Sequence, residues 1–304
     1  MRSLVFVLFI ALAASEFDPE IHRKFKTLPK HEFVSYFNSL NHSWTIAEYS
    51  DDIPLSYGAN FDANHGLPTI THDVMDLPQQ FDARQQWSQC ETIQQIKDQG
   101  SCGSCYLFGT INSLSDRTCI HNDVHVNLSE QDGECLDTSK CVCEGGHPPD
   151  VLQFWIQNGL VTEDCKPYDI QSLYEQQCHK KCVNPSMDYF NDKHFGDSAY
   201  QVDSDVDTIR AELVKNGPVV VGMTVYEDFQ DYRGGVYVHK YGKEKGHHAL
   251  RLIGFGTDDS GVDYWLLANS WGTVRGEGGF YRIKRNQPEV GIESRVFAGL
   301  PRKN

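Results

Sequence analysis

The ten cysteines of this chain are unevenly distributed, since every one of them lies at or beyond Cys90. This many cysteines indicates an oxidising compartment and a fold held together by disulfides. Zinc is the competing explanation, because Cys102 and Cys105 form one close pair and Cys141 and Cys143 form another. The spacing of the whole set does not repeat as it does in zinc ribbons and fingers, so we expect disulfides and no metal.

Residues 1–15 have the composition of a secretory signal peptide. A charged start at Arg2 is followed by an apolar run over residues 4–13 and by two small residues, which is the order typical of such signals. A membrane anchor would need about 20 apolar residues, and this run ends before Glu16. We therefore expect residues 1–15 to be removed in the secretory pathway, and we expect no membrane span elsewhere.

Residues 16–76 form a polar segment without cysteine. Apolar residues follow a helical spacing only in its early part, at Phe25, Leu28, Phe33, Tyr36, Phe37 and Leu40. Prolines and glycines between residues 54 and 68 then interrupt any long element. The change in composition predicts a separate leading segment, with a domain boundary near Leu77 and Pro78.

The first half of the cysteine-rich part predicts helices. One begins at Ser104, its expected cap, because a helical period of apolar residues follows; these are Leu107, Phe108, Ile111 and Leu114. Two more helices are expected at residues 149–158 and 205–216, since glycine follows each of them.

The second half predicts an antiparallel sheet, because runs of β-branched and aromatic residues alternate with glycines. The expected strands cover residues 219–225, 236–238, 249–255, 264–268 and 280–284. Together the two halves predict an α+β fold. The formal net charge of −15, with no stripe of Lys and Arg, argues against nucleic acid as a partner.

The strongest signal for chemistry is the octapeptide Gln-Gly-Ser-Cys-Gly-Ser-Cys-Tyr at residues 99–106, which contains a pattern known around nucleophilic cysteines. Cys105 would lie in the first turn of the predicted helix, where partial positive charge and free N–H groups gather. Both favour the reactive thiolate by lowering the pKa of the thiol, and a neighbouring imidazolium would lower it further.

Two downstream residues complete a constellation for acyl transfer. His248 falls within the interval of about 130–150 residues that is typical after such a nucleophile, and Asn269 lies slightly beyond it. They supply a proton shuttle and an amide that orients its ring. Gln99 can add a side-chain N–H that, with the backbone N–H of Cys105, binds a developing oxyanion. Each residue alone has an ordinary structural explanation, but their order and spacing favour catalysis.

On these residues the chain resembles the papain superfamily and, within it, cathepsin B, from about Trp44 to Arg302. Further matching segments are residues 77–84, 115–121, 192–196, 216–218, 291–294 and 298–302. The resemblance implies a papain-like two-domain fold, with a helical left domain, an antiparallel β-barrel-like right domain and the active-site cleft between them. Residues 77–304 would form the peptidase domain, with a left half at about 90–200 and a right half at about 201–300.

The same resemblance implies roles for further residues. Residues 16–76 would be an inhibitory propeptide that occupies the cleft until it is cleaved. Gly145 and Gly146 would line the substrate backbone, and Trp271 would shield the contact between the catalytic His and Asn. Three disulfides are implied, namely Cys90–Cys119, Cys102–Cys143 and Cys165–Cys182. Cys135 would join Cys178 or Cys141, which leaves one thiol besides the nucleophile.

Departures from cathepsin B bear on specificity. Its occluding loop carries a His-His pair that captures the carboxylate of the substrate, and no such pair lies between Cys165 and Cys182. We therefore expect an endopeptidase with weak carboxydipeptidase activity. Arg295 replaces a glutamate at the floor of the pocket for the second residue upstream of the cut. A cation there disfavours Arg and permits acidic or polar side chains.

Three other substitutions leave the catalytic atoms in place. Tyr106 and Arg275 replace tryptophans of the family, and His247 replaces the Gly before the catalytic His. His247 as the base would shift its strand by one residue and turn the side chains to the opposite face. We therefore favour His248.

These residues predict a cysteine endopeptidase of the cathepsin B type, made as a secreted zymogen, that works through a thiolate–imidazolium pair and a thioester. We expect a monomer without cofactors that acts on peptides and proteins and is inhibited by its own propeptide and by cystatin-type proteins. A lysosome-like or digestive vacuole, or the extracellular space, would be its location. The alternatives are a non-catalytic binding protein on this fold and a transferase such as a transglutaminase. The intact catalytic set argues against the first, and the cathepsin-like flanks argue against the second.

Overall fold

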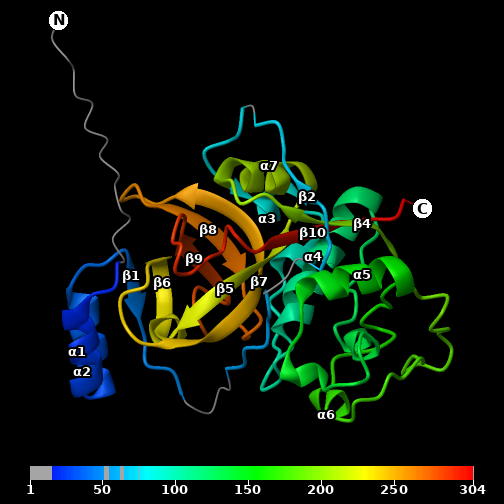
Figure 1. The fold of residues 1–304 in the computed structure, drawn as a ribbon, viewed down its shortest axis with the longest axis horizontal. Coiled ribbons are helices and arrows are strands. Elements are labelled where there is room, and N and C mark those ends of the chain that lie inside the picture. Colours follow the sequence, from blue (N-terminus) through cyan, green and yellow to red (C-terminus); the bar gives the residue numbers. More distant parts are fainter. Residues whose placement is uncertain (1–15, 51–54, 62–64, 75, 304) are drawn as a thin grey trace, which may run out of the picture.

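The structure, a computed structural model, describes residues 16–50, 55–61, 65–74 and 76–303 (Figure 1). The predicted signal peptide lies outside the described residues. Within these ranges, no helix combines the length and apolar character that crossing a membrane requires.

The leading segment folds into two helices and a strand, namely α1 (Pro19–Thr27), α2 (Lys30–Ser39) and β1 (Trp44–Ile46). The predicted helical spacing is confirmed, and the chain turns between the helices at Pro29, which lacks the N–H that a continuous helix needs. Ile21, Phe33 and Phe37 are buried against the rest of the protein. In Figure 1 the two helices lie beside the outer end of the sheet, where β1 pairs with β6.

Helix α4 (Cys105–Asn122) runs through the middle of the molecule and is buried along most of its length. Ser104 occupies the predicted cap position, but its side chain does not cap the helix, because its Oγ lies 2.9 Å from the hydroxyl of Tyr168. The other two predicted helices are confirmed as α5 (Pro148–Asn158) and α7 (Val206–Asn216). Shorter helical turns are α3 (Ala83–Gln86), α6 (Ile170–Leu173), η1 (Glu91–Gln94), η2 (Gln131–Cys135), η3 (Val142–Glu144) and η4 (Glu227–Asp231).

The strands form one sheet in the order β1-β6-β9-β8-β7-β5-β10-β4-β2, and β3 pairs with β7. Their bounds are β2 (Thr69–Ile70), β3 (Phe81–Asp82), β4 (Gly196–Val202), β5 (Val219–Tyr226), β6 (Tyr232–Tyr237), β7 (Glu244–Thr257), β8 (Asp263–Ala268), β9 (Phe280–Lys284) and β10 (Val296–Pro301). The α+β class is confirmed. The sheet is mixed rather than wholly antiparallel, because β6 pairs parallel with β9 and β2 pairs parallel with β4. The β6–β9 pairing is possible because the intervening strands β7 and β8 supply the long connection that parallel neighbours need.

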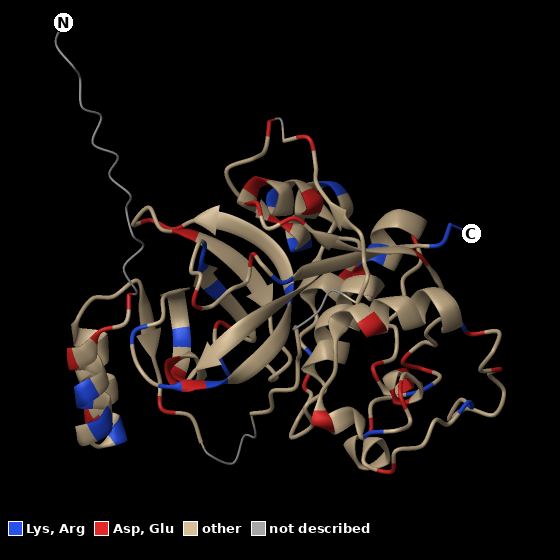
Figure 2. Ribbon diagram, in the orientation of Figure 1, with Lys and Arg blue, Asp and Glu red and all other residues tan. Residues whose placement is uncertain are grey.

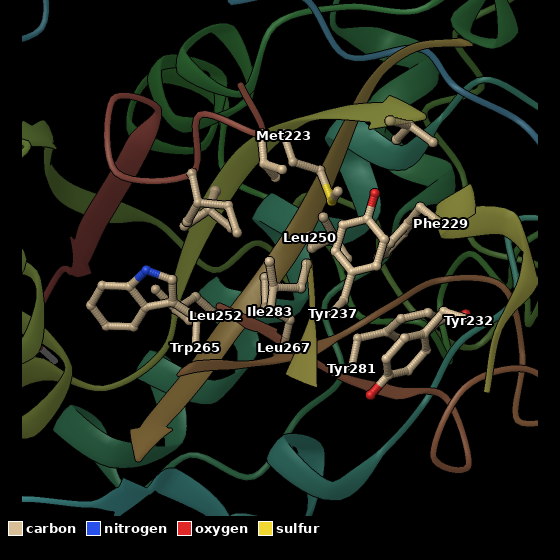
Figure 3. Packing of buried hydrophobic residues seen from close by; sticks show 14 of the residues in the cluster. Met223, Phe229, Tyr232, Tyr237, Leu250, Leu252, Trp265, Leu267, Tyr281 and Ile283 are labelled. Atoms are coloured by element: carbon tan, nitrogen blue, oxygen red, sulfur yellow. The ribbon is translucent and has the colours of Figure 1, made fainter. Parts of the chain in front are cut away.

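Two hydrophobic cores lie on opposite sides of β5 and β7. Figure 3 shows the first, where Leu250 and Leu252 of β7 pack with Met223 of β5 and Trp265 of β8. Ala249, which points the other way, packs with α4 and α5 in the second core. The alternation of side chains along β7 therefore joins the helical half to the sheet.

Helix α4 approaches β7 closely at Gly109. A Cβ atom there would lie 3.1 Å from Cγ2 of Val220 and 3.3 Å from the carbonyl carbons of Ala249 and Leu250. About two turns further along the helix, the Asp116 carboxylate pairs with the Arg251 guanidinium of β7 at 2.9 Å, with both side chains buried. This pair and the glycine contact fix the start of the helix relative to the strand.

We predict that Arg251→Met, in a full-length Cys105→Ser background, lowers the free energy of unfolding by about 3–5 kcal/mol, because it leaves the Asp116 carboxylate buried without its cation. Urea unfolding followed by circular dichroism measures this. Arg23→Met is the matched control, since Arg23 pairs with Glu20 on the exposed face of α1 and should leave the midpoint unchanged. Equal midpoints for the two variants would contradict the role given to the buried pair.

Candidate active site

The predicted catalytic residues come from three elements that meet at one place. His248 lies on β7, and Asn269 directly follows β8. The Nε2 atom of His248 lies 2.7 Å from Oδ1 of Asn269, and both side chains are buried. The indole of Trp271 stacks on the imidazole, with ring centroids 4.5 Å apart and planes 26° apart. The imidazole thus contacts the Asn269 amide through Nε2 and the Trp271 indole through its face.

Cys105 reaches the same place from the first turn of α4. Four backbone groups act on its sulfur and lower the pKa of the thiol, namely those of Ala249, Gly58, Tyr106 and Cys105 itself. Because Ala249 directly follows His248, the thiol lies against the strand that carries the imidazole. Nδ1 of His248 is buried and has no hydrogen-bond partner among the described residues, so this nitrogen is the one available to the nucleophile.

His247 lies on the other face of β7, where its side chain is partly exposed 3.9 Å from Glu244. The ring that meets Asn269 is therefore His248. Strand alternation separates the two adjacent histidines in the way that the sequence argument required.

The protonation states differ from the sequence-based expectation. Burial raises the pKa of the Cys105 thiol to about 11, although the four backbone amides oppose this shift. Burial also lowers the pKa of His248 to about 4, against the hydrogen bond to Asn269. Both side chains are fully buried while the leading segment covers them, and desolvation disfavours each charged form. In this form the thiol and the imidazole are both neutral at pH 7, so the predicted low thiol pKa is wrong for the intact chain.

Gln99 is held beside the thiol by both ends of its amide. Its Oε1 accepts a hydrogen bond from the Ser270 hydroxyl at 2.6 Å, and its Nε2 donates to the carbonyl oxygen of Cys102 at 2.9 Å. The same Nε2 also donates to the carbonyl oxygen of Ser56 at 3.3 Å. A backbone carbonyl of the leading segment thus occupies the place to which Gln99 directs its N–H.

Gly146 pairs with the backbone of the leading segment. Its N–H donates to the carbonyl of Gly58 at 2.8 Å, and its carbonyl accepts from the N–H of Asn60 at 2.9 Å. On the opposite side, the N–H of Ala59 donates to the carbonyl of His247 at 3.4 Å. Residues 58–60 therefore lie extended between Gly146 on one side and the backbone of His247 on the other. Gly145 permits the close approach of the leading segment, because a Cβ atom at this position would lie 2.5 Å from the Gly58 carbonyl oxygen.

Arg295 lies beside Phe61 of the leading segment. The phenyl ring stacks on Phe297 at 6.3 Å and lies so close to Gly222 that a Cβ there would lie 2.4 Å from it. The Arg295 guanidinium lies 5.6 Å from the ring centroid and donates to the Thr224 hydroxyl at 3.2 Å. The side chain that directly follows the extended residues 58–60 therefore lies beside the Arg295 guanidinium.

Disulfides connect the loops that surround the site. The structure contains the three implied pairs together with Cys135–Cys178, and it leaves Cys105 and Cys141 free. The open choice for Cys135 is thus resolved in favour of Cys178. Cys102–Cys143 links the loop before the nucleophile to the loop before Gly145, so one covalent bond fixes two sides of the site.

Sequence reasoning missed several residues that the structure brings to the site. Ser270 positions Gln99, and its place inside the Asn-Ser-Trp run was the available signal. Tyr57 covers the site from the leading segment, with its ring 6.1 Å from His248 and 5.9 Å from Trp271. No pattern in the sequence marks Tyr57 or Phe61.

Ion pairs also hold the leading segment against the rest of the protein. Figure 2 shows Lys and Arg along α1 and α2, which lie beside acidic positions near β6. Lys26 lies 3.2 Å from Glu227, and Lys30 lies 2.5 Å from Asp231. Lys240 lies 3.0 Å from Glu16 in the reverse arrangement. These pairs add to the apolar contacts of α1 and α2.

Comparisons with known proteins identify the family. The model described as "Papain family cysteine protease" matches residues 77–300. Cathepsin B-like cysteine proteinase 6 of Caenorhabditis elegans is 39% identical and covers 94% of this chain and 86% of its own length. Cathepsin B-like protease 1 of Arabidopsis thaliana is 36% identical over 93% of this chain and 83% of its own.

Solved structures agree with this assignment. Procathepsin B S9 from Trypanosoma congolense has a TM-score of 0.83 at 28% identity, covering 91% of this chain and 99% of that one. The digestive procathepsin L2 of Tenebrio molitor, at 23% identity, a TM-score of 0.70 and coverage of 92% and 90%, shares the fold. The chain is therefore a peptidase that belongs to the papain family of cysteine proteases, among its cathepsin B-like members.

Proposed function

We propose that this chain is the zymogen of a cysteine endopeptidase in which Cys105 is the nucleophile, His248 the general base and acid, Asn269 the orienting amide and Gln99 an oxyanion donor. The observation that carries this proposal is the 2.7 Å contact between His248 and Asn269, made on the strand whose next amide meets the Cys105 sulfur. Residues 16–76 act as its inhibitory propeptide and residues 77–304 as the peptidase.

Removal of the propeptide admits water and substrate to the pair. The thiol proton then moves to Nδ1 of His248, because hydration favours both charged forms. The thiolate attacks the peptide carbonyl, and the oxyanion accepts hydrogen bonds from Gln99 and the Cys105 amide. The imidazolium gives its proton to the leaving amine, and water deprotonated by His248 then hydrolyses the thioester. Family membership argues against a transglutaminase, and an unreactive thiol would indicate a binding protein instead.

The segment between the paired Cys165 and Cys182 supports endopeptidase activity. His179 is its one histidine, and this residue is held by Glu134, with its ring 3.3 Å and its amide 2.7 Å from the same carboxylate oxygen. No free pair of imidazoles is therefore offered to a substrate carboxylate there. We propose weak carboxydipeptidase activity.

Location and inhibitors follow as proposals from the same features. Four disulfides and cathepsin-named relatives support passage through the secretory pathway to a lysosome-like or digestive vacuole, or to the outside. The extended backbone of residues 58–60 between Gly146 and His247 supports peptide and protein substrates, and cystatin-type proteins are proposed inhibitors of the same groove. We propose that the enzyme acts as a monomer.

Gln99→Ala in the processed enzyme is expected to lower kcat by about 10²–10³, the usual cost of one oxyanion donor, whereas Cys105→Ser abolishes turnover. Peptide hydrolysis followed by fluorescence measures both variants. Gln171→Ala, on the short helix α6, is the control that should keep the parental rate. Mass spectrometry of the parental digests should show internal cuts without stepwise loss of C-terminal dipeptides. A Cys105→Ser protein that cuts at the parental rate would sink the assignment.

Thiol reactivity should report the raised pKa of Cys105. In the intact zymogen, alkylation by iodoacetamide is expected to speed up about tenfold per pH unit between pH 7 and 9, because the thiolate fraction rises below a pKa of about 11. After processing, the rate should be higher and nearly independent of pH in this range. Peptide mapping separates Cys105 from Cys141, and a flat profile in the zymogen would show that its thiolate is already formed.

Charge reversal at Arg295 should change specificity. Arg295→Glu is expected to shift the ratio of kcat/KM for substrates with Arg or Glu two residues upstream of the cut by at least about tenfold in favour of Arg. Paired fluorogenic peptides measure this ratio. Arg233→Glu, an exposed change of the same charge on β6, is the control. An unchanged ratio in Arg295→Glu would show that this cation does not contact the substrate.

A further inference from the structure

Three metal-ligating side chains lie together at the edge of the cleft, and they come from both parts of the chain. His65 belongs to the leading segment, whereas His147 and Asp150 lie at the start of α5. One ligand atom from each lies within 4.8 Å of the others. Nδ1 of His65 is 2.5 Å from Oδ1 of Asp150, and the two imidazole rings are 4.3 Å apart. Within the described ranges, no other group of three His, Cys, Asp or Glu side chains converges in this way.

The backbone on both sides holds these side chains in position. His147 is the N-cap residue of α5 and Asp150 lies in its first turn, so their spacing of three residues places them on one face. His65 is anchored to the same helix, because the Gln153 amide donates to its carbonyl oxygen at 2.9 Å. Gly146, adjacent to His147, pairs with the leading segment. The cluster therefore does not depend on the contact between His65 and Asp150 alone.

We propose that His65, His147 and Asp150 form a Zn²⁺ site that fastens the propeptide to the peptidase. Two imidazoles and one carboxylate are a ligand set that zinc prefers, with water in the fourth position. Nδ1 of His147 is buried and makes no hydrogen bond to a described residue. A cavity of about 230 Å³ borders His147 and Asp150 and leaves room for the bound water. The side chains of His65 and Asp150 remain 24% and 36% exposed, which gives the ion a path to the site.

The position of the three ligands makes the site specific to the zymogen. The full set exists only while the propeptide is docked, so zinc stabilises the docked state by mass action. Cleavage and departure of the propeptide remove His65 and leave two ligands, from which the ion dissociates. This inference rests on the proposed role of residues 16–76 as the propeptide, but it requires none of the proposed catalytic roles.

The test uses the full zymogen carrying Cys105→Ser, because this change prevents self-processing. After treatment with a chelator and dialysis, zinc chloride is titrated by calorimetry. We expect one stoichiometric site in this protein, and a Kd at least about tenfold higher after His65→Ala or after Asp150→Asn, since each removes a ligand. His31→Ala, a histidine on the exposed surface of α2, should leave the Kd unchanged. Zinc should also raise the Tm of the parent more than that of His65→Ala.

Two results would overturn the zinc site. One is the absence of stoichiometric binding in the Cys105→Ser zymogen, and the other is an equal Kd in the parent, His65→Ala and Asp150→Asn proteins. Melting of the metal-free proteins shows that the variants are folded, and Asp150→Asn preserves the size of the side chain if His65→Ala does not fold. Because no turnover is measured, a failure of the proposed catalytic roles would leave this result unaffected.

Discussion

The packing of helix α4 against strand β7 is the contact on which the active site depends. The helix supplies the sulfur and the strand supplies the imidazole, so their separation is fixed by how closely the two backbones approach. Gly109 permits that approach, because even a methyl group there would press on the carbonyl carbons of β7. The buried pair of Asp116 and Arg251 then sets the position of the helix along the strand. An ion pair is a suitable device for this purpose, since a small displacement leaves two desolvated charges unpaired.

The leading segment uses the site in the way a substrate would, but with different consequences for charge. Its backbone pairs with Gly146, its Ser56 carbonyl accepts a hydrogen bond from Gln99, and the Phe61 ring lies beside the Arg295 guanidinium. In this form Cys105 and His248 are completely buried. Binding of the leading segment and inhibition of the site therefore have the same cause, because the bound segment also removes the water that the charged pair of Cys105 and His248 needs.

The parts of the site that could be predicted from sequence are those encoded locally. The octapeptide around Cys105 and the order of His248 and Asn269 carry their chemistry in a few residues. The pKa of Cys105 could not be predicted, because desolvation by burial in the folded chain outweighs the backbone amides that oppose it. The strands β4 and β10 were missed because each contains only two β-branched or aromatic residues, and such residues were the signal used for the other strands. Cysteine spacing alone could not choose the partner of Cys135, and nothing in the sequence joins His65 to His147.

We propose that removal of the propeptide changes the pKa values of Cys105 and His248 in opposite directions through one physical cause. Desolvation raises the pKa of the thiol and lowers that of the imidazole, so hydration brings the two values together and favours proton transfer between them. Unlike the Gly58 amide, which belongs to the leading segment, the amides of Cys105, Tyr106 and Ala249 and the Asn269 contact all lie within residues 77–304. They are preorganised for the charged pair, yet they cannot stabilise it while the site is dry. We propose that the zymogen controls its activity through access of water to Cys105 and His248.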